Sequence, residues 1–392
     1  MEKRFLLKEN IKTLVLAVVA VGVMALAGCN GDDPDPDPEP TQTVLEILES
    51  NTEYSDFAEF YELYADELPD ISGETEFTLF LPNNAAFQTL RETLSVDDLT
   101  AIKESEILKV LSFHFISGTK TEISAGDAFT TDQGENITIN SDGTIKEGGS
   151  NPAVEILSST EATNGAVHVV NRILIPPTFF AFIVEHLGKI SQTIFLGGEF
   201  SILADVIAKA DTYAESTQGQ LTPHTTTLSN ADVSLTFFAP SNATFYAAAG
   251  VVDGDNAATI ATKVQGFMDN YSGQQFYGIV ANHIVTDDGN PDDDNTIINE
   301  TELETGATFP TAFTVDGENF GSLLVFNNTE VVPADNGIGV YLDSNGDVDL
   351  QNPGETLGNL DAEIVFPPSL SGIAPSNGSL YIIAGILVPP SE

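Results

Sequence analysis

The chain has 392 residues, of which 42% are hydrophobic, and its 59 acidic residues outnumber its 13 Lys and Arg to give a formal net charge of −46. Such a charge argues against a nucleic-acid partner, because binding phosphates needs clustered basic side chains. The single cysteine excludes an internal disulfide framework and any multi-cysteine metal site. The length exceeds what one hydrophobic core usually organises, so the sequence predicts two domains.

The amino-terminal residues have the pattern of a lipoprotein signal peptide. Four basic residues precede the uncharged apolar run of residues 13–27, which matches a secretory signal and is short for a membrane-spanning helix. The run ends in Leu26-Ala-Gly-Cys29, which resembles the bacterial lipobox. The sequence therefore predicts a signal peptide over residues 1–28 and lipid attachment at Cys29, which anchors the protein in the cell envelope; an inert cysteine is the alternative.

Residues 29–42 alternate acidic residues with proline and contain almost no apolar side chain. Such a segment cannot bury itself, and its prolines favour an extended conformation. It is predicted to be a tether that holds the folded part away from the bilayer. Its acidic start resembles the surface-export signals of Bacteroidetes lipoproteins, which implies an outer-membrane, surface-exposed protein. A plain solvated linker is equally compatible with the composition.

The rest of the chain contains the same three sequence blocks twice and in the same order. Residues 77–87 align without gaps with residues 235–245, and residues 164–177 align with residues 377–390. Between these blocks, His114 in Leu-Ser-Phe-His-Phe-Ile matches His283 in Val-Ala-Asn-His-Ile-Val. Three blocks in one order indicate an internal duplication.

Each copy is predicted to have helices followed by strands. Residues 44–48, 57–63 and 202–208 have helical spacing, whereas residues 136–145 contain short strands with turn signals. The first block is an apolar strand ended by proline, after which Asn84 and Asn242 suit the N-cap of the next helix. Phe87 and Phe245 are then expected to turn onto the core. These features predict an α+β fold with an antiparallel sheet.

These blocks resemble the fasciclin domain: Thr-x-Phe-x-Pro-x-Asn-Ala-x-Phe, the region around His114, and the closing Asn-Gly-x-x-His block with its Pro-Pro end. The resemblance implies two tandem fasciclin-like domains over residues 43–177 and 186–390, each an antiparallel β-sandwich wedge with helices beside it. It also implies a secreted or surface-anchored adhesion module without catalysis. The second copy departs from the pattern, because Tyr381 replaces the counterpart of His168. It is also longer, mostly after His283, where we expect loops or added strands.

The second copy has no Lys or Arg after Lys263 and carries two acidic clusters. Oxygen-bearing side chains alternate in the second cluster, as at the opening of an EF-hand-type loop, and predict a calcium site formed by Asp343, Asn345, Asp347 and Asp349. The expected sixth-position glycine is Val348, however, and no glutamate stands at the twelfth position. A solvated acidic turn is the alternative, and it is the favoured interpretation of the cluster at residues 287–295. A surface adapted to salty water would also explain the acidity.

Enzyme chemistry has little support in the sequence. His114 and His283 recur among apolar neighbours, which favours buried structural histidines over a general base. Nucleophile-elbow, zinc-protease and phosphate-loop motifs are absent from the sequence. We therefore predict a lipid-anchored adhesion protein that binds extracellular matrix, polysaccharide or a surface protein of a neighbouring cell. The alternatives are a calcium-dependent glycan-binding lipoprotein that serves outer-membrane nutrient uptake and a hydrolase that uses the inserted loops.

Overall fold

The computed structural model describes residues 39–146, 153–285, 297–298, 303–315, 318–319, 322–327, 337–344, 361–365 and 375–389. Residues 39–188 are called the first half and residues 189–389 the second half. The predicted signal peptide, Cys29 and most of the tether lie outside the described residues. Within them, no helix combines the length and the apolar character that crossing a membrane would need.

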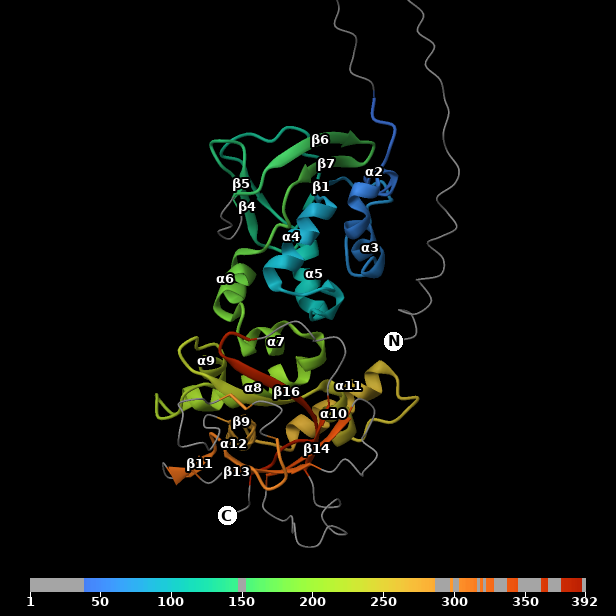
Figure 1. The fold of residues 1–392 in the computed structure, drawn as a ribbon. Helices are drawn as coiled ribbons and strands as arrows, with labels where there is room; N and C mark the ends of the chain where they lie inside the picture. Colours follow the sequence, from blue (N-terminus) through green and yellow to red (C-terminus); the bar gives the residue numbers. More distant parts are fainter. Residues whose placement is uncertain are drawn as a thin grey trace, which may run out of the picture. The chain divides into compact units, whose positions relative to one another are not determined.

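The first half begins with helices and continues with strands, as the sequence predicts (Figure 1). Its helices are α2 (Val44–Ser50), α3 (Ser55–Leu63), α4 (Asn84–Leu94), α5 (Glu104–Ser112) and α6 (Pro177–His186). Its strands are β1 (Phe77–Pro82), β2 (Phe115–Ser117), β3 (Ala128–Thr130), β4 (Asn136–Ile139), β5 (Ile145–Lys146), β6 (Ile156–Ala162) and β7 (Gly165–Val170).

The second half repeats this order and adds strands. Its helices are α7 (Ile190–Leu196), α8 (Ser201–Ser216), α9 (His224–Leu228), α10 (Asn242–Ala248), α11 (Ala257–Asp269) and α12 (Gly273–Asn282). Its strands are β8 (Leu235–Pro240), β9 (Ile284–Val285), β10 (Thr308–Pro310), β11 (Thr314–Val315), β12 (Glu318–Asn319), β13 (Ser322–Asn327), β14 (Gly337–Asp343), β15 (Ala362–Val365) and β16 (Gly378–Ala384). Among the described residues, six strands, β10–β15, lie between β9 and β16, whereas four strands, β3–β6, lie between β2 and β7, so the additional length after His283 includes added strands.

The sheets are mixed, which corrects the prediction of purely antiparallel sheets. In the first half β1 pairs in parallel with β7, and the four-stranded order is β2-β1-β7-β6. In the second half β8 pairs in parallel with β16, inside the seven-stranded order β10-β13-β14-β15-β16-β8-β9. Parallel partners need a long crossover, and here α4, α5 and several strands separate β1 from β7. Both strands of the first pair are almost wholly buried, as expected for parallel strands covered on both faces.

Alternate residues of the first central strand enter two different cores. Leu79 and Leu81 of β1 pack in the cluster formed with the helices, whereas Phe80 points to the opposite side and packs with the β3–β5 sheet. The second half does the same, since Phe237 faces its helices and Phe238 packs against the added strands. The period of two along a strand therefore gives the central strand of each half one face toward the helices and one face toward other strands, which form a separate sheet in the first half and belong to the same sheet in the second.

Candidate functional site

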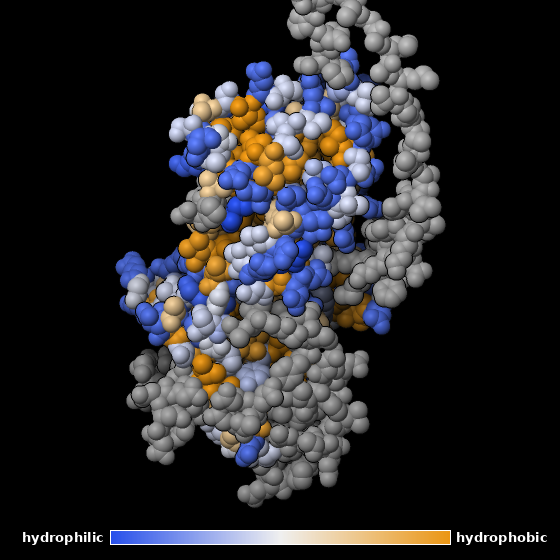
Figure 2. All heavy atoms as spheres, turned by 45° about the horizontal axis from the view of Figure 1, so that its top comes forward, coloured by the Kyte–Doolittle hydropathy of each residue, from blue (hydrophilic) through white to orange (hydrophobic). Residues whose placement is uncertain are grey.

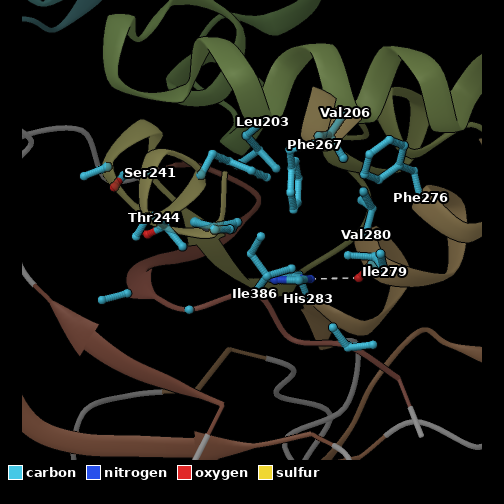
Figure 3. A pocket seen from close by; sticks show the side chains of 18 of the residues that line it. Leu203, Val206, Ser241, Thr244, Phe267, Phe276, Ile279, Val280, His283 and Ile386 are labelled. Atoms are coloured by element: carbon cyan, nitrogen blue, oxygen red, sulfur yellow. Dashed lines mark hydrogen bonds between the residues drawn. The ribbon is translucent and has the colours of Figure 1, made fainter. Parts of the chain in front are cut away.

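The second half contains an apolar groove of about 680 Å³, here called the second-half groove (Figure 3). It lies between α8, α10, α11, α12 and the segment that follows β16. Its walls are almost entirely apolar and include Leu203, Val206, Phe245, Ala248, Phe267, Phe276, Ile279, Val280, Ile386 and Val388. A volume of this size can hold a medium-sized ligand or a few apolar side chains.

His283 lies in the wall of this groove and has no free ring nitrogen. Its Nδ1–H donates to the Ile279 carbonyl at 2.7 Å, and its Nε2 accepts from the Leu387 N–H at 3.1 Å. Burial lowers the pKa of His283 from 6.5 to about 4, because the charged form would lose its hydration. A neutral imidazole with both nitrogens committed to backbone groups holds the end of α12 against the segment after β16. This confirms the prediction of a buried structural histidine.

His114 occupies the same position in the first half. Its Nδ1–H donates to the Val110 carbonyl at 2.8 Å and its Nε2 accepts from the Leu174 N–H at 3.0 Å. Burial lowers its pKa to about 4 as well. The hollow beside His114 measures only about 50 Å³, because Phe179 and Ile183 of α6 line it and pack in the adjoining core.

Two buried asparagines make matching sets of three hydrogen bonds. Asn164 Oδ1 accepts from Val44 N–H, the first residue of α2, and its Nδ2 donates to two carbonyls of residues 71 and 73. Asn377 Oδ1 accepts from Ile190 N–H, the first residue of α7, and its Nδ2 donates to the carbonyls of residues 228 and 230. Each asparagine therefore ties the start of a helix to the loop before the central strand.

The glycine after each asparagine lies directly against the central strand. A Cβ on Gly165 would be 1.9 Å from the carbonyl oxygen of Phe77, and one on Gly378 would be 1.8 Å from that of Leu235. Real Cβ atoms do not approach backbone this closely, so only glycine fits at these two positions. The sequence predicts a turn at each Asn-Gly pair, and the glycine of the pair also allows the two parallel strands to approach each other closely.

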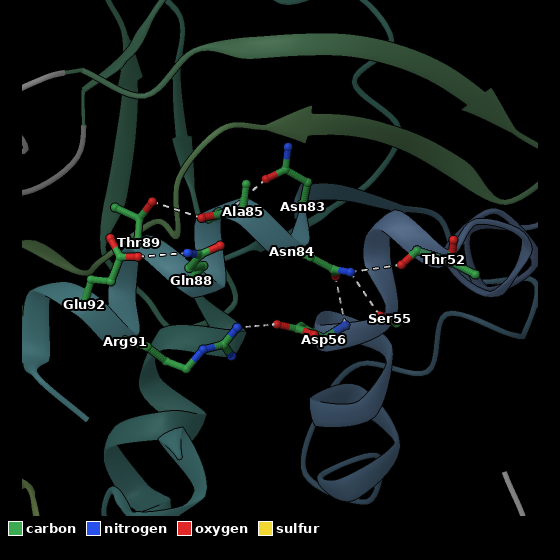
Figure 4. A network of polar contacts seen from close by, with 11 residues as sticks. Thr52, Ser55, Asp56, Asn83, Asn84, Ala85, Gln88, Thr89, Arg91 and Glu92 are labelled. Carbon is green, nitrogen blue, oxygen red and sulfur yellow. Dashed lines mark hydrogen bonds and ion pairs between the residues drawn. The ribbon is translucent and has the colours of Figure 1, made fainter. Parts of the chain in front are cut away.

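Asn84 and Asn242 do not cap their own helices, which corrects that prediction. The N-cap of α4 is Asn83, whose Oδ1 accepts from Ala86 N–H. Asn84 instead reaches across to the first turn of α3, where its Oδ1 accepts from Asp56 N–H and its Nδ2 donates to the Thr52 carbonyl (Figure 4). An asparagine side chain can accept a hydrogen bond from any unpaired backbone N–H at a helix terminus within reach. The position of an asparagine in the sequence therefore does not identify the helix that it caps.

The second half repeats this cross-helix bond. Ser241 is the N-cap of α10. Asn242 Oδ1 accepts from Ile202 N–H in the first turn of α8, and its Nδ2 donates to the Gly198 carbonyl and to Ser201 Oγ. Asn84 likewise reaches Ser55 Oγ. Phe87 and Phe245, three residues after each asparagine, are buried, as predicted.

Tyr381 takes the structural place of His168. Both are paired in the same register with the central strand, opposite Phe80 and Phe238 respectively. His168 Nε2–H donates to the Lys120 carbonyl, while the Tyr381 hydroxyl donates to the Ile298 carbonyl. Both rings are buried, so each needs a polar partner. A histidine at this position is therefore replaceable by another aromatic donor.

The predicted calcium loop is described at its first residue only. Asp343 ends β14 and is buried, whereas Asn345, Asp347 and Asp349 lie outside the described residues, as do residues 287–295. Within the described ranges no three His, Cys, Asp or Glu side chains form a group that could hold a metal ion. Calcium binding by this loop stays a prediction.

Hydrophilic and hydrophobic residues are interspersed on the face of the protein drawn in Figure 2.

A fasciclin-domain family model matches residues 52–176. The protein sll1483 of Synechocystis is 28% identical over 138 residues, which are 34% of this chain and 74% of that protein. The immunogenic protein MPB70 of Mycobacterium bovis is 26% identical over 110 residues, which are 28% of this chain but only 55% of that protein. A solved FAS1 domain pair from the insect cell adhesion molecule Fasciclin I aligns over 85% of this chain and 96% of its own, at 15% identity and a TM-score of 0.30. The family model confirms the resemblance seen in the sequence for residues 52–176, which match the fasciclin domain.

Proposed function

We propose that this protein is a surface-anchored adhesion lipoprotein whose second half is a second fasciclin-like domain. The single observation that carries the tandem arrangement is the repeated set of polar ties. The pairs Asn164 and Asn377, and His114 and His283, make the same bonds to matching backbone groups in the two halves. Since such buried networks depend on the tertiary arrangement around them, their repetition supports two copies of one fold.

The adhesive role rests on the family, because fasciclin domains are adhesion-type domains. The proposed partners are extracellular matrix, a polysaccharide or a surface protein of a neighbouring cell. Two similar modules held on one lipid anchor by the tether of residues 29–42 would bind such a repetitive surface together. Weak contacts would then be multiplied through the effective concentration of the second module. The buried asparagines and histidines described above hold backbone groups in place through hydrogen bonds, which is a structural role.

This proposal is tested by displaying the full chain on a bacterial host and measuring adhesion of the cells to immobilised polysaccharides and matrix proteins. Labelled fatty acid should be incorporated by the wild type and not by the Cys29→Ser variant, and adhesion should be lost together with the label. The control is Ser50→Ala, a conservative change of an exposed residue at the end of α2. Adhesion no better than that of cells without the protein, or adhesion that persists without the lipid, would contradict the proposal.

The second candidate function is calcium-dependent glycan binding in support of outer-membrane nutrient uptake. It is favoured by Asp343, a buried carboxylate at the end of β14 that directly precedes the alternating oxygen ligands of the acidic loop. Glycan binding by the full chain should then disappear with a chelator and return with added calcium. Asp347→Ala should abolish the calcium effect, whereas Asp293→Ala in the other acidic cluster should not. Equal binding with and without calcium would reject this function.

A further inference from the structure

The second-half groove and the small hollow beside His114 are built from matching residues. The aligned blocks and the repeated hydrogen bonds identify which residues of the two walls correspond. The corresponding residues, first half before second half, are Phe57 and Leu203, Phe60 and Val206, Phe87 and Phe245, Leu90 and Ala248, Ile107 and Phe276, Val110 and Ile279, His114 and His283, Ile173 and Ile386, and Ile175 and Val388. The two hollows are therefore the same feature of the fold, and they differ mainly in what occupies them.

In the first half this feature is filled by helix α6. The chain leaves β7, passes Pro176, and enters α6 at Pro177. Phe179 and Ile183, one helical turn apart, lie on one face of α6 and are 8% and 6% exposed. They line the hollow beside His114 and reduce it to about 50 Å³. The fold thus uses this position to receive the apolar face of a helix.

In the second half no described residue takes the place of Phe179 and Ile183. The description ends at Pro389, the counterpart of Pro176. Val388 on the rim is 45% exposed, although its counterpart Ile175 is packed against the core. Four wall residues are also smaller than their counterparts, with Leu203 for Phe57, Val206 for Phe60, Ala248 for Leu90 and Val388 for Ile175, whereas Phe276 and Ile279 are larger than Ile107 and Val110. An apolar hollow of about 680 Å³ results.

We propose that the second-half groove binds an amphipathic α-helix of a partner protein, in the manner in which the first half binds α6. The apolar face of that helix carries an aromatic and a branched aliphatic residue at positions i and i+4, and its opposite face carries Lys or Arg. The apolar pattern follows from Phe179 and Ile183, which fill the matching hollow. The basic face follows from the net charge of −46 and from the absence of Lys and Arg after Lys263. Helix-in-groove recognition of this kind relies on a few such anchors.

The groove offers little to a polar ligand. The Thr244 hydroxyl donates to the Ile383 carbonyl, and both nitrogens of His283 are bonded to backbone groups. Binding would come from burying apolar side chains, with opposite charges speeding the encounter. This inference goes beyond the adhesive function and does not depend on it, because the groove is defined by the fold alone.

The test uses a fluorescent peptide with the sequence of residues 176–188 in which the positions of Val184 and Leu187 are lysine. Both residues are exposed, Val184 on α6 and Leu187 at the C-cap of α6, so the changes add positive charge outside the apolar face. Fluorescence anisotropy with the full-length protein should show saturable binding. The same peptide with Phe179→Asp and Ile183→Asp should bind at least tenfold more weakly. Since this comparison alters only the peptide, it does not depend on how a protein variant folds.

Two protein variants locate the site. Ala248 lines the groove yet is exposed, so Ala248→Phe should occupy the groove without disturbing the core and weaken binding at least tenfold. Ala258→Phe, at an exposed position of α11 outside the groove, should bind like the wild type. The proposal is overturned if binding is not saturable, if Ala248→Phe binds normally, or if a peptide with glutamates at the two lysine positions binds equally well. Dimers of the protein that the peptide dissociates would instead assign the groove to a second copy.

Discussion

Replacing Asn164 by alanine should destabilise the first half by about 3 kcal/mol. The side chain is 5% exposed, and all three of its hydrogen bonds, of 2.8 to 2.9 Å, go to backbone groups. Each bond contributes about 0.5–1.5 kcal/mol net, and the cost rises where a buried partner is left unsatisfied. Val44 N–H is such a partner, because Val44 is fully buried at the start of α2. For a unit of this size the midpoint of thermal unfolding should fall by roughly 6–12 °C.

Urea unfolding followed by circular dichroism measures the loss, and hydrogen exchange locates it. Peptides that contain α2 and residues 71–73 should exchange faster in Asn164→Ala, while the second half stays protected. Asn377→Ala should give the reciprocal pattern, with faster exchange in α7 and α9. The control is Asn171→Ala, since the partly exposed Asn171 side chain accepts from one backbone N–H and donates to the Glu155 carboxylate at 3.3 Å, and it should cost about 1 kcal/mol. A loss for both Asn164→Ala and Asn377→Ala that is no larger than the loss for Asn171→Ala would refute the argument.

The remaining predictions concern a glycine, the buried histidines and the tyrosine. Gly165→Ala should destabilise by at least about 3 kcal/mol in urea unfolding, because its Cβ meets a backbone oxygen, whereas Gly266→Ala in open space on α11 should be neutral or stabilise by up to about 1 kcal/mol. His114 and His283, whose pKa values fall to about 4 on folding, bind fewer protons when folded, so stability is full above pH 6.5 and decreases as the pH falls toward 4. Lowering the pH from 7.5 to 5 should reduce the free energy of unfolding by about 2 kcal/mol for each of the two histidines. Imidazole NMR signals that titrate near pH 6.5 would contradict this prediction. Tyr381→Phe removes one buried hydroxyl bond to a backbone carbonyl and should cost about 1 kcal/mol; an unchanged urea midpoint would argue against that bond.

Local features were predictable because they depend on neighbours in the chain. The helical spacing of residues 44–48, 57–63 and 202–208 corresponds to helices α2, α3 and α8. The hairpin signal of residues 136–145 corresponds to β4 and β5. The burial of Phe87 was likewise anticipated, since a large apolar side chain at that point of a helix has a core to enter.

Features that join distant parts of the chain were not predictable in the same way. An asparagine after a strand suits an N-cap, but the amide that Asn84 binds belongs to Asp56, 28 residues earlier. The predicted antiparallel pairing is wrong for β1 and β7, although their nearly continuous apolar runs are a signal of buried parallel strands. The groove is not predictable from the sequence, because its lining residues come from five separate segments of the chain. The apolar run after Pro177 was the available signal for the helix that fills its counterpart.

By itself the sequence determined the duplication, the order of the elements, the buried positions and the acidity, because repetition, hydrophobic period and charge are properties of the chain. The tertiary structure alone decided which backbone groups the repeated asparagines and histidines bind, and that the central strands run parallel. It also decided that one of two matching hollows is filled by α6 while the other is open among the described residues. Those outcomes depend on which segments meet in space, and side-chain volume and hydrogen-bond geometry select them only once the halves are folded.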